Sequence, residues 1–375
     1  MSRFSIFADK IRSLYTTSTA TTPVISPNTK VLFILKYREL YGEQVHKSYS
    51  SGLYNSASFV SNMLTTCGIQ SKIVEVADNN YIHKEVNDYQ PTHVIIEALW
   101  VVPSKLKLLA SMYPNIKWII RVHSNTSFIA NEGIAIKWLS EYLISNNNVY
   151  ISVNSIRFIN DLTIILEAKH THNTIDTDRI LYLPNYYEFT SNNPPAHTID
   201  YYNQNVNIGC FGAIRPLKNQ LIQAVAAIKF ANQHHKILHF HINDERLEQG
   251  GDNVLKNLQA VFSNTPHILV LHEWLERKQF LELVHNMDMC MQVSISETFN
   301  IVAADSVNEN VPVIVSSEID WIDKLYHANA MCVNDIVDRL TYAWSLPSQL
   351  NNWKHLHNYN LVSKAQWVLV LSQKV

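Results

Sequence analysis

This chain of 375 residues has few glycines and few cysteines, and its positive and negative charges nearly balance. It has eight glycines and four cysteines, and its formal net charge is −2. This balance excludes the domain-wide basic excess of many nucleic-acid-binding proteins, although it is compatible with a local basic groove. The cysteines have the spacing of neither a metal site nor a disulfide framework. We therefore expect reduced, mostly buried thiols in a cytoplasmic protein.

Long apolar runs are also missing. None approaches the roughly 20 residues of a membrane-spanning helix, and the opening MSRFSIFADK lacks the apolar region of a signal peptide. We therefore expect no membrane span. Histidine is plentiful, but HExxH is absent and the paired histidines form no convincing ligand set. We predict no metal site, and we interpret His239 and His241, on one strand face, as structural.

Short apolar runs alternate with helical stripes through most of the chain. KVLFILK, THVIIEAL and KWIIRVH belong to a first series, and a second series begins at VNIGCFG after a polar stretch with two prolines. This alternation predicts an α/β fold with two doubly wound parallel sheets. The predicted segments are 1–29 (N-terminal arm and linker), 30–195 (first α/β domain), 205–350 (second α/β domain) and 351–375 (C-terminal helix).

The stretch 287–316, MDMCMQVSISETFNIVAADSVNENVPVIVS, predicts a strand, a turn, a helix and a second strand. Ser296, Glu297 and Thr298 precede the helix, where free backbone N–H groups favour a phosphate or another anion. Glu297 and Asp305 lie about two helical turns apart. One carboxylate can accept a hydrogen bond from a sugar hydroxyl and the other from a ribose. The alternative is that Glu297 caps a helix and Asp305 is a solvated helix residue.

The second α/β series opens with GCFGAIRPLKN at 209–219. Gly212 can turn the chain directly after the strand, which leaves Arg215 and Lys218 near the carboxyl edge of the sheet, where ligands bind. Two cations there would neutralise a diphosphate and stabilise the charge that grows on it during bond cleavage. The alternative is a solvated helix start with incidental charges.

The two motifs resemble elements of retaining glycosyltransferases with the GT-B fold, particularly family 4. S-x-S-E-T-F and the V-P-V-I strand flank an E-x7-E element in which Asp305 replaces the second Glu. Lys218 matches the Lys of the G-R-L-x-x-x-K element, whereas Ala213 stands where Arg is usual. Asn300 replaces the glycine of the usual F-G pair, and Asn tolerates left-handed backbone better than most residues.

The resemblance implies two Rossmann-like domains facing a cleft, with the final helix crossing back onto the first domain. It also implies a metal-independent hexosyl- or pentosyltransferase without a cofactor, whose co-substrate is a nucleotide-diphosphate sugar, with UDP-sugar favoured. Arg215 and Lys218 would contact the phosphates, Glu297 the sugar and Asp305 the ribose. His123, at the end of the strand WIIRVHS, would oppose them, although a strand-end histidine can also be structural. The implied donor-site residues are Gly212, Arg215, Lys218, Ser296, Glu297, Thr298, Phe299, Asn300 and Asp305.

A long polar and aromatic loop between Tyr37 and Tyr54 follows the first predicted strand. Long loops at a ligand-binding edge are often functional, and we expect Arg38, Ser51 and Gly52 to contact the acceptor. An ordinary surface loop is the alternative.

The segments YGEQVHKSYSSGLYNSASFV and THVIIEALWVVP of the first domain are similar to glycosyltransferase-like proteins of tailed phages, some of whose relatives glycosylate modified DNA bases. This resemblance implies the cytoplasm of a host cell and, as acceptor, a hydroxymethylated pyrimidine base of phage DNA. A glycan, lipid-linked or protein acceptor is the rival within the enzyme class. Epimerisation of a nucleotide sugar and a non-catalytic nucleotide-sugar-binding protein also remain open. The oligomeric state is not predicted.

Overall fold

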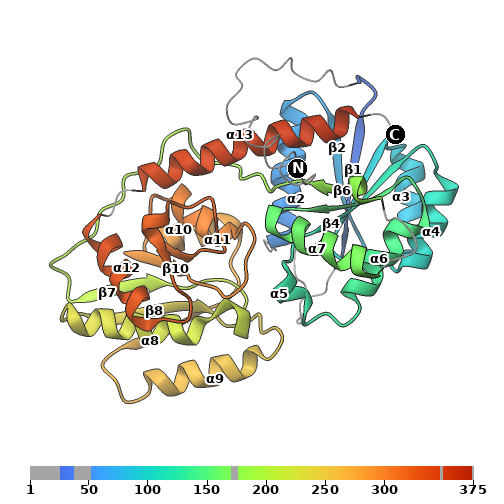
Figure 1. The fold of residues 1–375 in the computed structure, drawn as a ribbon. Coiled ribbons are helices and arrows are strands. Elements are labelled where there is room, and N and C mark those ends of the chain that lie inside the picture. Colours follow the sequence, from blue (N-terminus) through green and yellow to red (C-terminus); the bar gives the residue numbers. More distant parts are fainter. Residues whose placement is uncertain (1–25, 38–51, 170–175, 347–348, 374–375) are drawn as a thin grey trace, which may run out of the picture.

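The computed structural model describes residues 26–37, 52–169, 176–346 and 349–373. Within these ranges the chain forms two six-stranded sheets, each covered by helices, and a long C-terminal helix (Figure 1). Every strand pair in both sheets is parallel. The predicted α/β fold with two doubly wound parallel sheets is therefore confirmed.

The first sheet has the strand order β2-β1-β3-β4-β5-β6. Alternate residues of its strands enter apolar clusters on opposite faces: Leu32 and Ile34 of the first strand enter one cluster, and Val31 and Phe33 enter the other. Helices cover both faces because parallel sheets bury both. The strands are β1 (Lys30–Lys36), β2 (Gln70–Val76), β3 (His93–Glu97), β4 (Lys117–Val122), β5 (Val149–Val153) and β6 (Ile180–Tyr182). The helices are α2 (Gly52–Thr66), α3 (Ile82–Tyr89), α4 (Pro103–Met112), α5 (Thr126–Ile129), α6 (Ala135–Ser145) and α7 (Ile156–Lys169), with a 3₁₀ turn η1 (Thr177–Arg179).

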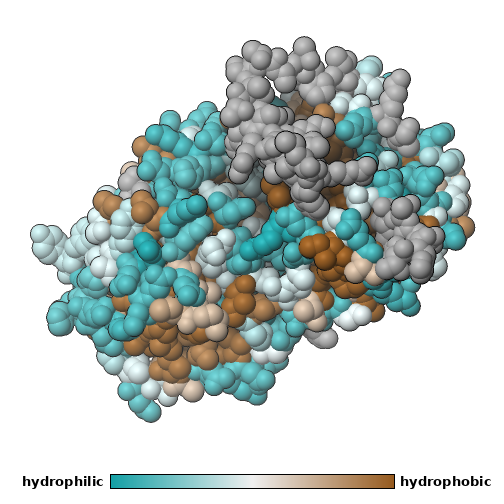
Figure 2. All heavy atoms as spheres, in the orientation of Figure 1, coloured by the Kyte–Doolittle hydropathy of each residue, from teal (hydrophilic) through white to brown (hydrophobic). Residues whose placement is uncertain are grey.

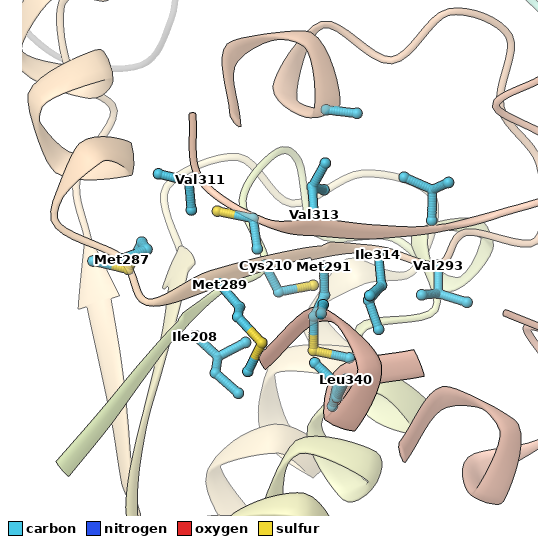
Figure 3. Close-up of a cluster of buried hydrophobic side chains, with 14 of the residues drawn as sticks. Ile208, Cys210, Met287, Met289, Met291, Val293, Val311, Val313, Ile314 and Leu340 are labelled. Carbon is cyan, nitrogen blue, oxygen red and sulfur yellow. The ribbon is translucent and has the colours of Figure 1, made fainter. Parts of the chain in front are cut away.

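The second sheet has the order β12-β11-β10-β7-β8-β9. The strands are β7 (Asn205–Gly209), β8 (Ile237–Asn243), β9 (Ile268–His272), β10 (Met289–Gln292), β11 (Val313–Ser316) and β12 (His327–Ala328). The helices are α8 (Gln220–Gln233), α9 (Gly251–Phe262), α10 (Arg277–His285), α11 (Ile301–Asn308) and α12 (Val333–Ser345), with 3₁₀ turns η2 (Pro216–Lys218) and η3 (Lys324–Tyr326). In the core, Met289, Met291 and Ile314 point toward Leu340 of α12, and Val313 points to the opposite face (Figure 3). The outer face drawn in Figure 2 is mostly hydrophilic, with apolar side chains gathered over α8 and α9.

The C-terminal helix α13 (Leu350–Ser372) spans both domains (Figure 1). In its first half, Tyr359 stacks on Phe299 of the second domain. Near its end, the Trp367 indole N–H donates to the carbonyl of Pro184 over 2.9 Å, and Leu371 enters the core beside β1 and α2. The returning helix implied by the resemblance is therefore present, and it ties the two domains together.

Candidate active site

The carboxyl edges of the two sheets meet at the loop that follows β10. The Thr298 hydroxyl donates to the His123 carbonyl over 3.2 Å and accepts from the Asn154 amide over 3.0 Å. The Asn125 side-chain amide donates to the Glu297 carbonyl. The loops after β4 and β5 therefore hold the predicted donor-site loop directly, so the first domain helps to position Glu297.

Lys218 and Glu297 come together at the edge of the second sheet. Gly212 makes the turn after β7 with a φ of 113°, a value that L side chains rarely adopt, and its N–H donates to Asn243 Oδ1 over 3.0 Å. Lys218 Nζ forms an ion pair with Glu297 Oε1, and both side chains are largely buried. The predicted phosphate-binding cation therefore lies against the predicted sugar-binding carboxylate.

Arg215 lies where the two domains meet. Its guanidinium forms an ion pair with Glu248 at 3.0 Å and lies over the ring of Phe128, from the first domain, at 4.7 Å. Arg246 also pairs with Glu248, at 2.6 Å. Burial opposes ionisation of Glu248, but the two guanidinium groups outweigh it and hold the pKa of Glu248 below its ordinary value. Arg215 is therefore anchored by groups from both domains.

A buried charged network at the ends of β3 and β4 was not predicted from the sequence. The Glu97 side chain is fully buried, pairs with Arg121 at 3.0 Å and accepts a hydrogen bond from His123 Nε2 over 2.5 Å. Arg121 also donates to Asn185 Oδ1 over 2.7 Å. Burial opposes the charge on Glu97, but Arg121 and His123 outweigh it and lower its pKa. Glu97 is therefore an ionised carboxylate that fixes the ring of His123.

The protonation of His123 follows from this contact. Burial lowers the pKa of His123, and the attraction of Glu97 only partly offsets the effect, so the imidazole is neutral near pH 7. Because an ionised carboxylate only accepts, Nε2 carries the proton and Nδ1 keeps its lone pair. His123 thus has an acceptor nitrogen that can take a hydrogen bond or a proton from a hydroxyl group.

Asn300 shapes the start of α11. Its φ is 59°, which confirms that asparagine adopts the left-handed backbone where the resemblance has glycine. Its side-chain oxygen caps the helix by accepting from the Ala303 N–H over 2.9 Å, and its amide donates to Gln292 over 2.8 Å. The preceding Phe299 ring is buried and stacks on Trp321. The side chains of Phe299 and Asn300 therefore contact other second-domain residues and stabilise the turn between Glu297 and α11.

The carboxylate of Asp305 is buried and already accepts hydrogen bonds from two side chains. Its side chain is 3% exposed, and Oδ1 accepts from the Tyr187 hydroxyl and from Arg277, both over 2.8 Å. Arg277 also lies over the ring of Phe59 at 4.8 Å. The alternative of a solvated helix residue is therefore wrong. Contact with a ribose stays a prediction, and Arg277 is a charged neighbour that the sequence analysis missed.

The remaining predicted site residues are placed as follows. Ser296 is buried within the same loop as Glu297. Gly52 is the exposed first residue of α2, and Arg38 and Ser51 lie outside the described residues.

Across the described ranges, no group of three or more His, Cys, Asp or Glu side chains could hold a metal ion. In the same part of the chain, no helix is both long enough and apolar enough to cross a membrane.

Comparison with known proteins identifies the fold. No family model matches the sequence, and no curated protein matches it in sequence. Among solved structures, a UDP-forming α,α-trehalose-phosphate synthase from Burkholderia vietnamiensis superposes with a TM-score of 0.63 at 10% identity, covering 92% of this chain and 97% of the other. The N-terminal domain of Candida albicans trehalose-6-phosphate phosphatase gives 0.62 at 11% identity, covering 95% and 99%.

A third similar structure is TarM, with a TM-score of 0.59 at 15% identity over 79% of this chain and 57% of TarM. These identities are too low to carry an activity from one protein to another, but the superpositions cover both sheets of this chain. The two parallel six-stranded sheets with their covering helices match these neighbours in fold. The chain therefore has the GT-B fold.

Proposed function

We propose that this protein is a retaining glycosyltransferase that uses a nucleotide-diphosphate sugar, with a UDP-sugar favoured. The observation that carries the proposal is the juxtaposition of Lys218 and Glu297 at one sheet edge, beside the loop that bears His123 on the facing edge. Ligands of doubly wound sheets bind at this edge. The neighbouring structures with the same fold include a UDP-forming sugar-phosphate synthase.

Each side chain has a role in the proposed reaction. The diphosphate binds beside Arg215 and Lys218, which stabilise the negative charge that develops on it. Glu297 accepts a hydrogen bond from a hydroxyl of the donor sugar, and Nδ1 of neutral His123 accepts another from the facing side. In the structure, Lys218 pairs with Glu297 and Arg215 pairs with Glu248. A bound diphosphate therefore shares cations that already have carboxylate partners.

The bond changes follow same-face substitution. The bond between the anomeric carbon and the phosphate oxygen breaks, and its electron pair leaves with the diphosphate. The acceptor hydroxyl oxygen then bonds to the same face of the sugar, and its proton passes to an oxygen of the leaving phosphate. No enzyme nucleophile takes part, and the two cations supply the electrostatic stabilisation without a metal.

The proposed acceptor is a hydroxyl group, and two classes of acceptor compete. A hydroxymethylated pyrimidine base of DNA is suggested by the resemblance to phage proteins, but Arg38 and Lys47, the loop cations that would contact its phosphates, lie outside the described residues. A glycan is the main rival. Lipid and protein acceptors, epimerisation and binding without turnover are further outcomes of the experiment below.

The test is incubation with a panel of nucleotide sugars and acceptors in EDTA, followed by mass spectrometry. Transfer, or slow donor hydrolysis, that persists in EDTA supports the proposal. Complete loss of activity in EDTA that Mg²⁺ or Mn²⁺ restores would contradict metal independence. Altered nucleotide sugar without acceptor would indicate an epimerase, and binding without any turnover would indicate a scaffold.

A further inference from the structure

Asn154, in the first domain, links the buried charged network of that domain to the loop that carries Glu297. It follows β5 directly and is buried. Its side-chain amide donates to the Thr298 hydroxyl over 3.0 Å and to Asn185 Oδ1 over 3.4 Å. Thr298 belongs to the second domain and follows Glu297 in the chain. The roles proposed above give Asn154 no part in the reaction.

These hydrogen bonds close into a ring that holds His123 at two points. Asn185 Oδ1 also accepts from Arg121 over 2.7 Å. Arg121 pairs with Glu97, which accepts from Nε2 of His123. Thr298 completes the ring by donating to the backbone carbonyl of His123 over 3.2 Å. The imidazole is therefore fixed by Glu97, and the backbone of the same residue is fixed by a side chain of the second domain.

The direction of both bonds to Thr298 is set by the donors available. A hydroxyl group has one proton and two lone pairs. Thr298 gives its proton to the His123 carbonyl and accepts from the amide of Asn154. A methyl group of similar size can replace neither bond. The position of Thr298, and with it the position of Glu297, therefore depends on Asn154.

Two further contacts join the same segments. Both terminal nitrogens of Arg157, in the first turn of α7, donate to Glu318 of the second domain, over 2.9 and 2.7 Å. The Asn125 amide donates to the Glu297 carbonyl. The Arg157 side chain is 51% exposed, so solvent screens its ion pair. The buried amide of Asn154 is not screened in this way, and its geometry is the more restrictive.

We propose that Asn154 is a positioning residue for glycosyl transfer, which holds Glu297 and His123 in register across the domain boundary. This inference rests on the proposed function, because it needs the roles given there to Glu297 and His123. The nucleotide contacts proposed for Lys218 and Arg215 do not use Asn154. The proposal therefore predicts an effect on the rate of bond cleavage and little effect on UDP affinity.

The experiment compares Asn154→Ala, Thr298→Val and the double variant. Titration calorimetry gives the UDP affinity, and kcat and KM are measured with the nucleotide sugar that the wild type consumes fastest. Hydrogen exchange of the segment 294–300 without ligand reports the position of the loop independently of turnover.

Asn148→Ala is the matched control, because Asn148 precedes β5 at the opposite end of the strand. Its amide donates to the carbonyls of Ala110, Tyr113 and Ile116 within the first domain. This variant should lower Tm, and it should leave kcat and the exchange of the segment 294–300 as they are in the wild type. It therefore separates a general loss of stability from a loss of register.

We expect Asn154→Ala to lower kcat at least about tenfold, because small misplacements of reacting groups cost this much or more. Its UDP affinity should stay within about threefold of the wild type, and the segment 294–300 should exchange faster. The double variant should lose no more than Thr298→Val alone, because residues that act through one bond are not additive.

Three results would overturn the inference: wild-type kcat and exchange in Asn154→Ala, the same kcat loss in Asn148→Ala, or losses that multiply in the double variant. Absence of both UDP binding and donor consumption in the wild type would instead contradict the proposed function.

Discussion

The two sheet edges at the domain junction hold their charges in different ways. In the first domain, Glu97 and Arg121 are completely buried and bonded to each other. In the second, Lys218 and Arg215 keep 12% and 16% of their side chains exposed, and each has one carboxylate partner within ion-pair distance. The first network is closed to solvent, whereas the second is partly open to it. Under the proposed function, the first domain positions a neutral imidazole, and the cations of the second exchange a carboxylate for the diphosphate.

The largest expected effect is on stability, and it separates the buried Glu97 network from the partly exposed ion pair of Glu248. Glu97→Ala leaves Arg121 buried without its carboxylate and should lower the free energy of unfolding by about 3–5 kcal/mol. Glu248→Ala removes a carboxylate that is 23% exposed and should cost about 0–1 kcal/mol. Urea unfolding of the two variants measures the difference. Similar losses for both would show that the Glu97 network is no more important for folding than an ion pair near the surface.

The candidate site residues that sequence reasoning could predict lie near each other along the chain. Glu297, Thr298 and Asn300 belong to one turn between a strand and a helix, where periodicity and helix-start chemistry are informative. Lys218 was found in the same way, because a glycine turn after a strand brings its loop to the ligand-binding edge. The parallel sheets followed from the alternation of apolar runs and helical stripes.

The Glu97 network was missed because its partners come from separate strands. A usable signal was nevertheless present: Glu97 and Arg121 are opposite charges within the otherwise apolar runs THVIIEAL and KWIIRVH. Charges in buried strands need partners, and adjacent parallel strands can supply them. The partners of Asp305 were missed for a similar reason, since Tyr187 and Arg277 approach it from distant segments. Pairing between segments requires the tertiary fold.

An intermediate effect concerns pH, and it is largest for His93 in the first domain and His241 in the second. Burial, together with Lys117, lowers the pKa of His93 to about 4. Burial, together with His272 and His239, lowers the pKa of His241 to about 4. Between the ordinary histidine pKa of about 6.5 and pH 4, the unfolded chain binds more protons than the folded chain, so stability falls as the pH falls.

Each histidine should contribute on the order of 1–3 kcal/mol to this loss, which is fully recovered above the ordinary histidine pKa. Denaturant unfolding between pH 7 and pH 4 measures it, and His93→Gln should flatten the slope relative to the wild type. A slope that is identical in the variant would show that His93 is not held in its neutral form by the fold.

The smallest effect tests the turn that carries Glu297. Asn300→Ala loses the helix cap and places a β-carbon at a φ of 59°, so it should cost about 1–2 kcal/mol. Asn300→Gly loses the cap but relieves the backbone, so it should cost less than about 1 kcal/mol. Thermal unfolding gives the ranking. If glycine were the more damaging substitution, the side-chain bonds of Asn300 would matter more than its backbone conformation.

The proposed function depends most directly on donor binding by the exchangeable cations of the second domain. Titration calorimetry with UDP should show affinity at least about tenfold weaker in Lys218→Ala than in the wild type, because a charge-assisted contact is worth about 1.5–3 kcal/mol. Arg215→Ala should weaken binding similarly. The matched control is Lys278→Ala, whose side chain is 89% exposed and lies on α10, and it should bind as the wild type does. Unchanged UDP affinity in both Lys218→Ala and Arg215→Ala would contradict the account.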